Sequence, residues 1–122
     1  MPVTVTRTYL TLASPTTLVP GRGAAAARLV HIAPCPVEQW RALYRQIGAP
    51  WQWHDRDRWD QSRMQAHLER DDVRIYHVAD DPVGHGSAPL GFLELERHAD
   101  GSVEIAYLGL DRRAFGRGLG GW

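Results

Sequence analysis

The chain of 122 residues has one cysteine, no excess of either charge and no long apolar run. Since Cys35 has no second cysteine to pair with, an internal disulfide is excluded, and we expect a cytoplasmic protein. Fourteen basic and fourteen acidic residues balance, so the charge indicates no nucleic-acid partner. No stretch reaches the roughly 18 apolar residues of a membrane-spanning helix, so we expect no membrane partner.

The spacing of apolar residues predicts an α/β protein of the α+β type, with a mostly antiparallel sheet flanked by helices. The length is that of a single domain. We expect residues 1–27 to form an N-terminal strand and a loop, and residues 28–122 to form the core. The predicted strands are residues 3–12, 28–33, 73–79, 90–97 and 103–110, and the predicted helices are residues 36–47 and 60–68.

The last twenty residues contain the most informative pattern. Residues 103–110 read VEIAYLGL, an apolar strand, and DRRAFGRGLGGW follows. Glycines at positions 116, 118 and 120 would allow backbone N–H groups to converge on an anion, and a helix starting after them would add its positive dipole end. The pattern predicts a phosphate-binding loop; the alternative is a glycine-rich tail with no ligand.

This strand and loop resemble the central motif of the Gcn5-related N-acetyltransferases, the GNAT superfamily, in which Gln/Arg-x-x-Gly-x-Gly/Ala follows a strand. Read letter by letter, this motif matches residues 113–118, Arg-Ala-Phe-Gly-Arg-Gly. Counting from the end of the strand instead places Phe115 at the Gln/Arg position, with Gly118 and Gly120 as the glycines. We prefer the second register, because it matches the usual loop core and the binding is mostly through the backbone.

The resemblance covers most of the chain from about residue 28 and implies the amino-terminal half of a GNAT domain, truncated after the fourth core strand. The segment GAPWQW followed by Asp55 and Arg56 also resembles a bacterial GNAT subgroup of unassigned substrate. A C-terminally incomplete domain would leave the edge of strand 103–110 unpaired. The chain alone is therefore expected to be a poor enzyme and to associate, with a homodimer through the open sheet edge as one form.

The function implied by the resemblance is acetyl transfer from the thioester of acetyl-CoA, as acetyl-donor cosubstrate, to a small-molecule or peptide amine. The end of the strand would pair with the pantetheine and polarise the thioester oxygen, and the loop would hold the pyrophosphate. Arg117 would add a charged contact or face water. The implied cofactor contacts are Leu108, Gly109, Leu110, Phe115, Gly116, Arg117, Gly118, Leu119 and Gly120.

Glu104 is the first candidate for the catalytic base, because it lies six residues before Leu110, where histone-type members of the family have a catalytic Glu. Strand alternation predicts that Glu104 shares a face with Leu108 and Leu110. A partly buried carboxylate there would have a raised pKa and accept the proton of the attacking amine. Alternatively, Glu104 pairs with an arginine across the hairpin. Glu94 and Glu96 are the next candidates, as bases or as contacts to the acceptor amine.

Residues 51–59 join the two predicted helices, where the family shapes its acceptor pocket. Trp51 and Trp53 are candidates for stacking on a cationic or aromatic substrate, and Asp55 for pairing with an amine. The alternative is that the tryptophans only fasten a loop to the core. The six histidines show no metal-binding spacing, so no metal is expected.

Two other functions remain open. The first is a non-catalytic remnant that binds coenzyme A or a protein partner. The second is a nucleotide-binding module, which the sequence disfavours because Gly-Gly-Trp, and not Gly-Lys-Ser/Thr, follows the loop.

Overall fold

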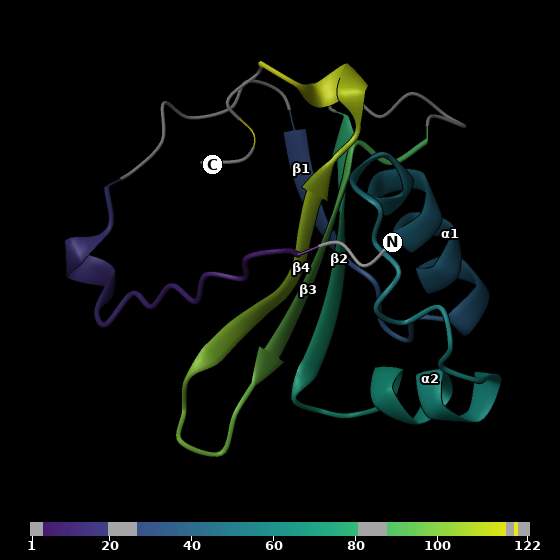
Figure 1. Ribbon diagram of the computed structural model, residues 1–122, viewed down its shortest axis with the longest axis horizontal. Helices are drawn as coiled ribbons and strands as arrows, with labels where there is room; N and C mark the ends of the chain where they lie inside the picture. Colours follow the sequence, from purple (N-terminus) through teal and green to yellow (C-terminus); the bar gives the residue numbers. More distant parts are fainter. Residues whose placement is uncertain (1–3, 20–26, 81–87, 117–118, 120–122) are drawn as a thin grey trace.

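The computed structural model describes residues 4–19, 27–80, 88–116 and 119. A four-stranded antiparallel sheet with strand order β1-β2-β3-β4 has two helices on one face (Figure 1). The α+β class with an antiparallel sheet is thus confirmed. The elements are β1 (Ala27–His31), α1 (Val37–Gly48), α2 (Gln61–Leu68), β2 (Val73–Asp80), β3 (Gly91–Arg97) and β4 (Val103–Leu110), with short 3-10 turns η1 (Pro15–Thr17), η2 (Ala49–Trp51) and η3 (Arg112–Ala114).

Both helices begin after residues that suit a helix start, and α1 packs as its sequence predicts. Helix α1 follows Pro36, whose fixed φ suits the start of a helix, and α2 follows Asp60, whose carboxylate accepts a hydrogen bond from the N–H of Arg63 at 2.8 Å. Apolar residues at helical spacing turn one face of α1 onto the sheet. The buried members of this face are Val37, Trp40, Leu43, Tyr44 and Ile47.

The core lies in two parts. The larger part fills the space between α1, α2 and the sheet, where Trp40 and Phe92 are almost completely buried. The smaller part lies at the end of β4, where Val78 and Leu90 pack with Ala114 and Leu119. Leu119 belongs to the glycine-rich segment, so this segment is connected to the core by at least one buried side chain.

A β-bulge in the β3–β4 hairpin changes which residues of β4 share a face. Leu95 pairs with Ile105 and Glu94 pairs with Tyr107, so Ala106 has no partner. Because a bulge adds one residue to a strand of period two, it moves the residues before it to the other face. Glu104 therefore lies on the helix-covered face with Tyr107, and the predicted shared face with Leu108 and Leu110 is wrong.

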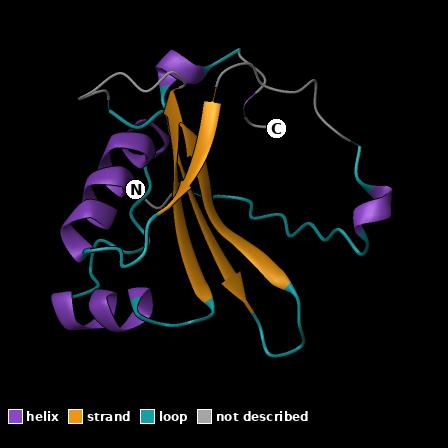
Figure 2. Ribbon diagram, turned by 180° about the vertical axis from the view of Figure 1, so that it is seen from behind, coloured by secondary structure: helices purple, strands orange, loops and turns teal. Residues whose placement is uncertain are grey.

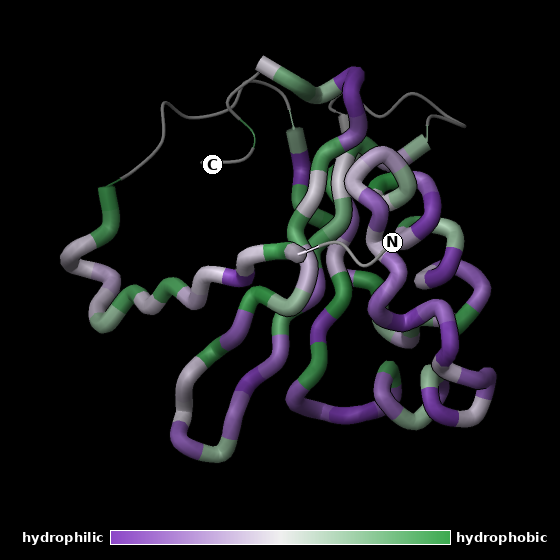
Figure 3. The backbone as a smooth tube through the Cα atoms, viewed as in Figure 1, coloured by the Kyte–Doolittle hydropathy of each residue, from purple (hydrophilic) through white to green (hydrophobic). Residues whose placement is uncertain are grey.

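The predicted strand at residues 3–12 is also wrong over the part that the structure describes. Residues 4–12 form neither strand nor helix (Figure 2). Hydrophobic and hydrophilic residues are mixed along this threonine-rich segment (Figure 3), and Val5 is 82% and Leu10 91% exposed. Alternation and β-branched residues favour an extended chain, but a strand is stable only when its backbone pairs with a neighbour.

No helix among the described residues has both the length and the apolar character needed to cross a bilayer.

Candidate functional site

Two predicted acceptor residues, Trp51 and Trp53, lie beside predicted cofactor residues at the carboxyl end of β4. Trp53 follows η2 and packs against this strand: a Cβ built on Gly109 would lie 2.9 Å from its ring. Its ring centroid is 5.0 Å from that of Tyr107 on the same strand. Trp51 is exposed and lies beside Phe115, with ring centroids 6.2 Å apart. Two aromatic residues after α1 therefore border the end of β4 and the start of the glycine-rich segment.

The turn after β4 is held by local hydrogen bonds. Asp111 caps η3 by accepting from the N–H of Arg113 at 3.1 Å, and Gln46 of α1 donates to the other oxygen of Asp111 at 3.3 Å. Gly116 then has φ of 76°, a left-handed conformation that favours glycine. Arg117, Gly118 and Gly120, which the resemblance assigns to pyrophosphate binding, lie outside the described residues, as does the predicted start of a following helix.

Gly109 has a packing reason to be glycine. A Cβ at this position would lie 2.5 Å from Cγ2 of Ile47, a distance that side-chain carbons do not tolerate. Gly109 therefore allows α1 and Trp53 to pack closely against β4 on the helix-covered face of the sheet. Leu108 lies on the opposite face and is about half exposed, and Leu110 is half-buried there.

Glu104 lies on the exposed part of β4, far from the turn η3 that follows the strand. Its carboxylate pairs with Nε2 of His98 at 3.0 Å, so the partner across the hairpin is a histidine and not an arginine. The side chain is 55% exposed. Glu104 and Leu108 are four positions apart on β4, about 13 Å at the usual rise, so a proton released beside Leu108 reaches Glu104 only through water.

Glu94 is fully buried, and each oxygen of its carboxylate has two partners in the core. Its Oε1 accepts from Nε1 of Trp40 at 2.9 Å and from Nη1 of Arg56 at 2.7 Å. Its Oε2 accepts from Nη2 of Arg56 at 2.6 Å and pairs with Nε2 of His67 at 3.0 Å. With 0% of its side chain exposed, Glu94 has no surface for a substrate in this conformation, and the geometry favours a structural role.

Arg56 connects this carboxylate to the loop that carries the tryptophans. Its guanidinium lies over the rings of Trp59 and Tyr107, 4.7 Å from each centroid, and near Trp40 at 5.3 Å. An arginine tolerates burial when its guanidinium stacks on aromatic rings and pairs with a carboxylate through two hydrogen bonds. Arg56 thereby anchors residues 52–60 against α1 and β4.

The electrostatics of Glu94 follow from this arrangement. Burial alone would raise its pKa, but hydrogen bonds from His67 and Arg56 and the charge of Arg56 outweigh burial and lower the pKa to about 2. Burial, with Tyr44 adding to it, raises the pKa of Tyr107 well above its usual range. Glu94 is therefore ionised and Tyr107 neutral at physiological pH, which suits a fixed anion among aromatic neighbours.

Asp55 remains available on the surface. Its side chain is 71% exposed, and its carboxylate lies 3.7 Å from the guanidinium of Arg7 in the N-terminal segment. Exposed pairs at that distance contribute little to stability. Asp55 thus keeps the character expected of a contact to a cationic group.

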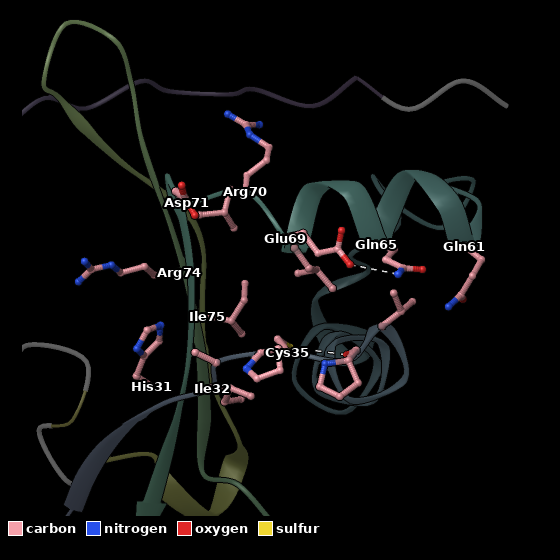
Figure 4. Close-up of a pocket in the computed structure, with 16 residues that line it drawn as sticks. His31, Ile32, Cys35, Gln61, Gln65, Glu69, Arg70, Asp71, Arg74 and Ile75 are labelled. Atoms are coloured by element: carbon pink, nitrogen blue, oxygen red, sulfur yellow. Dashed lines mark hydrogen bonds between the residues drawn. The ribbon is translucent and has the colours of Figure 1, made fainter.

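A cavity of about 720 Å³ lies elsewhere, between β1, β2 and α2 (Figure 4). None of the predicted site residues lines it. Cys35 does, donating a weak hydrogen bond to the carbonyl of Pro36 at 3.6 Å. Burial raises the pKa of this thiol to about 11, so it stays protonated near neutral pH and is disfavoured as a nucleophile.

The sequence alone did not single out Arg56 and His67. Both lie in charged, aromatic stretches that look exposed, and no local spacing connects them with Glu94 on β3. The one available signal is Glu94 itself, because a carboxylate at a buried strand position requires partners.

The sequence matches no protein-family model and no curated protein.

Proposed function

We propose that the chain is the coenzyme A-binding part of an N-acetyltransferase of the GNAT type, which transfers an acetyl group from acetyl-CoA to an acceptor amine. One observation carries the proposal: the aromatic segment after α1 meets the end of β4, directly before the glycine-rich segment. The element order β1-α1-α2-β2-β3-β4 is compatible with the resemblance.

In this proposal the neutral amine nitrogen forms a bond to the thioester carbonyl carbon and the carbon–sulfur bond breaks. The proton that the attacking nitrogen then loses goes to the sulfur, and coenzyme A leaves as the thiol. Backbone N–H groups of residues 108–110 stabilise the developing oxyanion, and the glycine-rich segment binds the pyrophosphate. Trp51 and Asp55 contact the cationic acceptor. Glu104 takes the proton of the ammonium group through water, because the strand spacing excludes direct contact.

Binding of coenzyme A is the first test. We expect calorimetry to detect binding to the wild-type chain, and Gly118→Val to abolish it, because a β-branched side chain blocks the approach of a phosphate to the backbone. The matched control is Ala99→Val, an exposed position without a left-handed φ in the turn at the other end of β4, which should leave binding intact. Equal binding by wild type and Gly118→Val would sink the phosphate-loop assignment.

The pH–rate profile is the second test. In a version of the chain completed to a whole acetyltransferase domain, with acetyl-CoA and a panel of amines, release of free thiol measures transfer. We expect Glu104→Gln to lower the rate most below about pH 8, where the amine is protonated and needs a base. A profile unchanged by Glu104→Gln would remove this residue from the proposed role.

The alternative is a module that binds a protein and catalyses nothing, and the sheet face opposite the helices favours it. Val103, Ile105 and Leu108 project from β4 on that face and are 58%, 60% and 48% exposed. Exposed apolar clusters promote association. Sedimentation should then show oligomers that Ile105→Lys disperses, and coenzyme A should not bind.

A further inference from the structure

The β3–β4 hairpin gathers three side chains of the kinds that bind metals. Glu96 and Glu104 are direct cross-strand partners, and His98 lies just beyond β3. The donor atoms of the three residues all lie within 4.8 Å of one another. Nε2 of His98 and Oε1 of Glu104 are 3.0 Å apart, close to the spacing of two ligands that share one ion.

The backbone holds these residues in place. The N–H of His98 donates to the carbonyl of Ser102 at 2.8 Å, and the N–H of Gly101 donates to the carbonyl of His98 at 3.0 Å. Asp100 accepts from both the N–H and the hydroxyl of Ser102. Ligands that come from paired strands and a hydrogen-bonded turn need little ordering before they bind.

The charges of the cluster also favour a cation. Two carboxylates directly opposite each other on neighbouring strands repel. In the structure Arg70 lies 3.0 Å from Glu96. Arg70 also makes two hydrogen bonds to Asp72, at 3.0 and 2.7 Å, so it keeps an anionic partner when Glu96 turns to a metal.

We propose that Glu96, His98 and Glu104 bind one zinc ion. An imidazole nitrogen with two carboxylate oxygens is a donor set that zinc accepts, whereas calcium and magnesium prefer oxygen alone. Three protein ligands leave a fourth position for water, and Glu104 is exposed enough to leave room for it. The imidazole distinguishes this cluster from an ordinary group of surface acids.

The proposal stands apart from acetyl transfer, and it is tested without an acyl donor. Zinc binding would nevertheless affect the proposed acetyl transfer, because both involve Glu104. A zinc ion on Glu104 draws electron density from the carboxylate and makes it a weaker base, so bound zinc opposes the base role.

Titration calorimetry with zinc chloride on the wild-type chain tests the site. We expect one ion per chain, and at least tenfold weaker binding in His98→Ala and in Glu104→Gln. The matched control is His54→Ala, because His54 also pairs with an exposed carboxylate, Asp57 at 2.8 Å, but is in no described cluster of three ligands. This variant should bind zinc as the wild type does. Cobalt in place of zinc should give visible absorption of a tetrahedral site, lost in His98→Ala.

The proposal would be overturned if the wild-type chain bound no zinc, or if wild type and His98→Ala bound it equally. An equal loss in His98→Ala and His54→Ala would overturn it too. Displacement of zinc by equimolar calcium would also overturn it, because calcium gains nothing from the imidazole. All the altered side chains are substantially exposed, so the variants are expected to fold, and thermal unfolding of each serves as a check.

Discussion

Two charged clusters lie on the same face of the β3–β4 hairpin, and they differ in their exposure to solvent. Glu94 is completely buried, and Arg56 and His67 pair with it inside the core. Glu96, two residues further along β3, faces Glu104 near the turn of the hairpin, where both carboxylates meet water. The residue types are alike, but burial differs.

Burial decides what each cluster contributes. A buried ion pair that loses one partner leaves an uncompensated charge in a medium of low dielectric, which is strongly destabilising. An exposed pair is screened by water and contributes little, so its groups remain free to bind something else. The inner cluster therefore fixes the fold, and the outer cluster is where a ligand can bind.

The largest expected effect comes from breaking the inner cluster. Glu94→Gln keeps the shape of the side chain but leaves Arg56 without a counter-charge. We expect a loss of about 3–5 kcal/mol in the free energy of unfolding, measured with urea. The double variant Glu94→Leu with Arg56→Met should recover part of this loss, because no unpaired charge remains. A loss below about 1 kcal/mol for Glu94→Gln would show that the inner cluster does not anchor the fold.

Acid should break the same cluster in the wild-type chain. The pKa of Glu94 is about 2 in the fold against an ordinary value of 4.5, so the folded state favours the ionised form. The stabilisation is complete above about pH 4.5 and is lost as the pH falls toward 2, an effect of about 3 kcal/mol for this shift. Urea unfolding between pH 6 and pH 2 measures it.

The acid-dependent loss must be separated from that of other carboxylates. Hydrogen bonds from Arg70, Ser102 and Arg113 lower the pKa values of Asp72, Asp100 and Asp111 respectively, and these groups contribute with the same sign. Glu94→Gln is the control, because it should flatten the pH dependence while these aspartates remain. A slope unchanged in Glu94→Gln would assign the acid sensitivity to the surface.

A smaller effect is expected where the inner face of β4 meets α1. Gly109→Ala places a methyl group against Ile47 and Trp53, and overpacking of this kind costs about 1–3 kcal/mol. The neighbouring Leu108→Ala, on the exposed face, is the control and should change the free energy of unfolding less. The reverse order of the two losses would contradict the described packing.

The smallest expected effect is in the outer cluster. Glu104→Gln should change the free energy of unfolding by no more than about 0.5 kcal/mol, since its pair with His98 is exposed. Thermal unfolding without added metal measures this. A loss comparable to that of Glu94→Gln would erase the distinction between the two clusters.

Local pattern was enough to predict six of the regular elements. Helix α1 follows from apolar residues at helical spacing, and β4 from an apolar run between turn residues, because both signals are local. Residues 3–12 have the same kind of signal as a strand but lack a described pairing partner, so the prediction failed there. The bulge at Ala106 could not be predicted from the sequence either, because it is defined by the pairing with β3. This bulge reverses the face of Glu104.

The sequence by itself determined the α+β class and the limits of most strands and helices. Only the tertiary structure decided that Glu94 is a buried anchor, because its partner Arg56 is 38 residues away and pairs with it only in the folded chain. The same holds for Glu96, His98 and Glu104, which the strand register brings together. Spacing along a chain fixes local conformation, whereas the chemistry of a charged group depends on neighbours and solvent that only folding assigns.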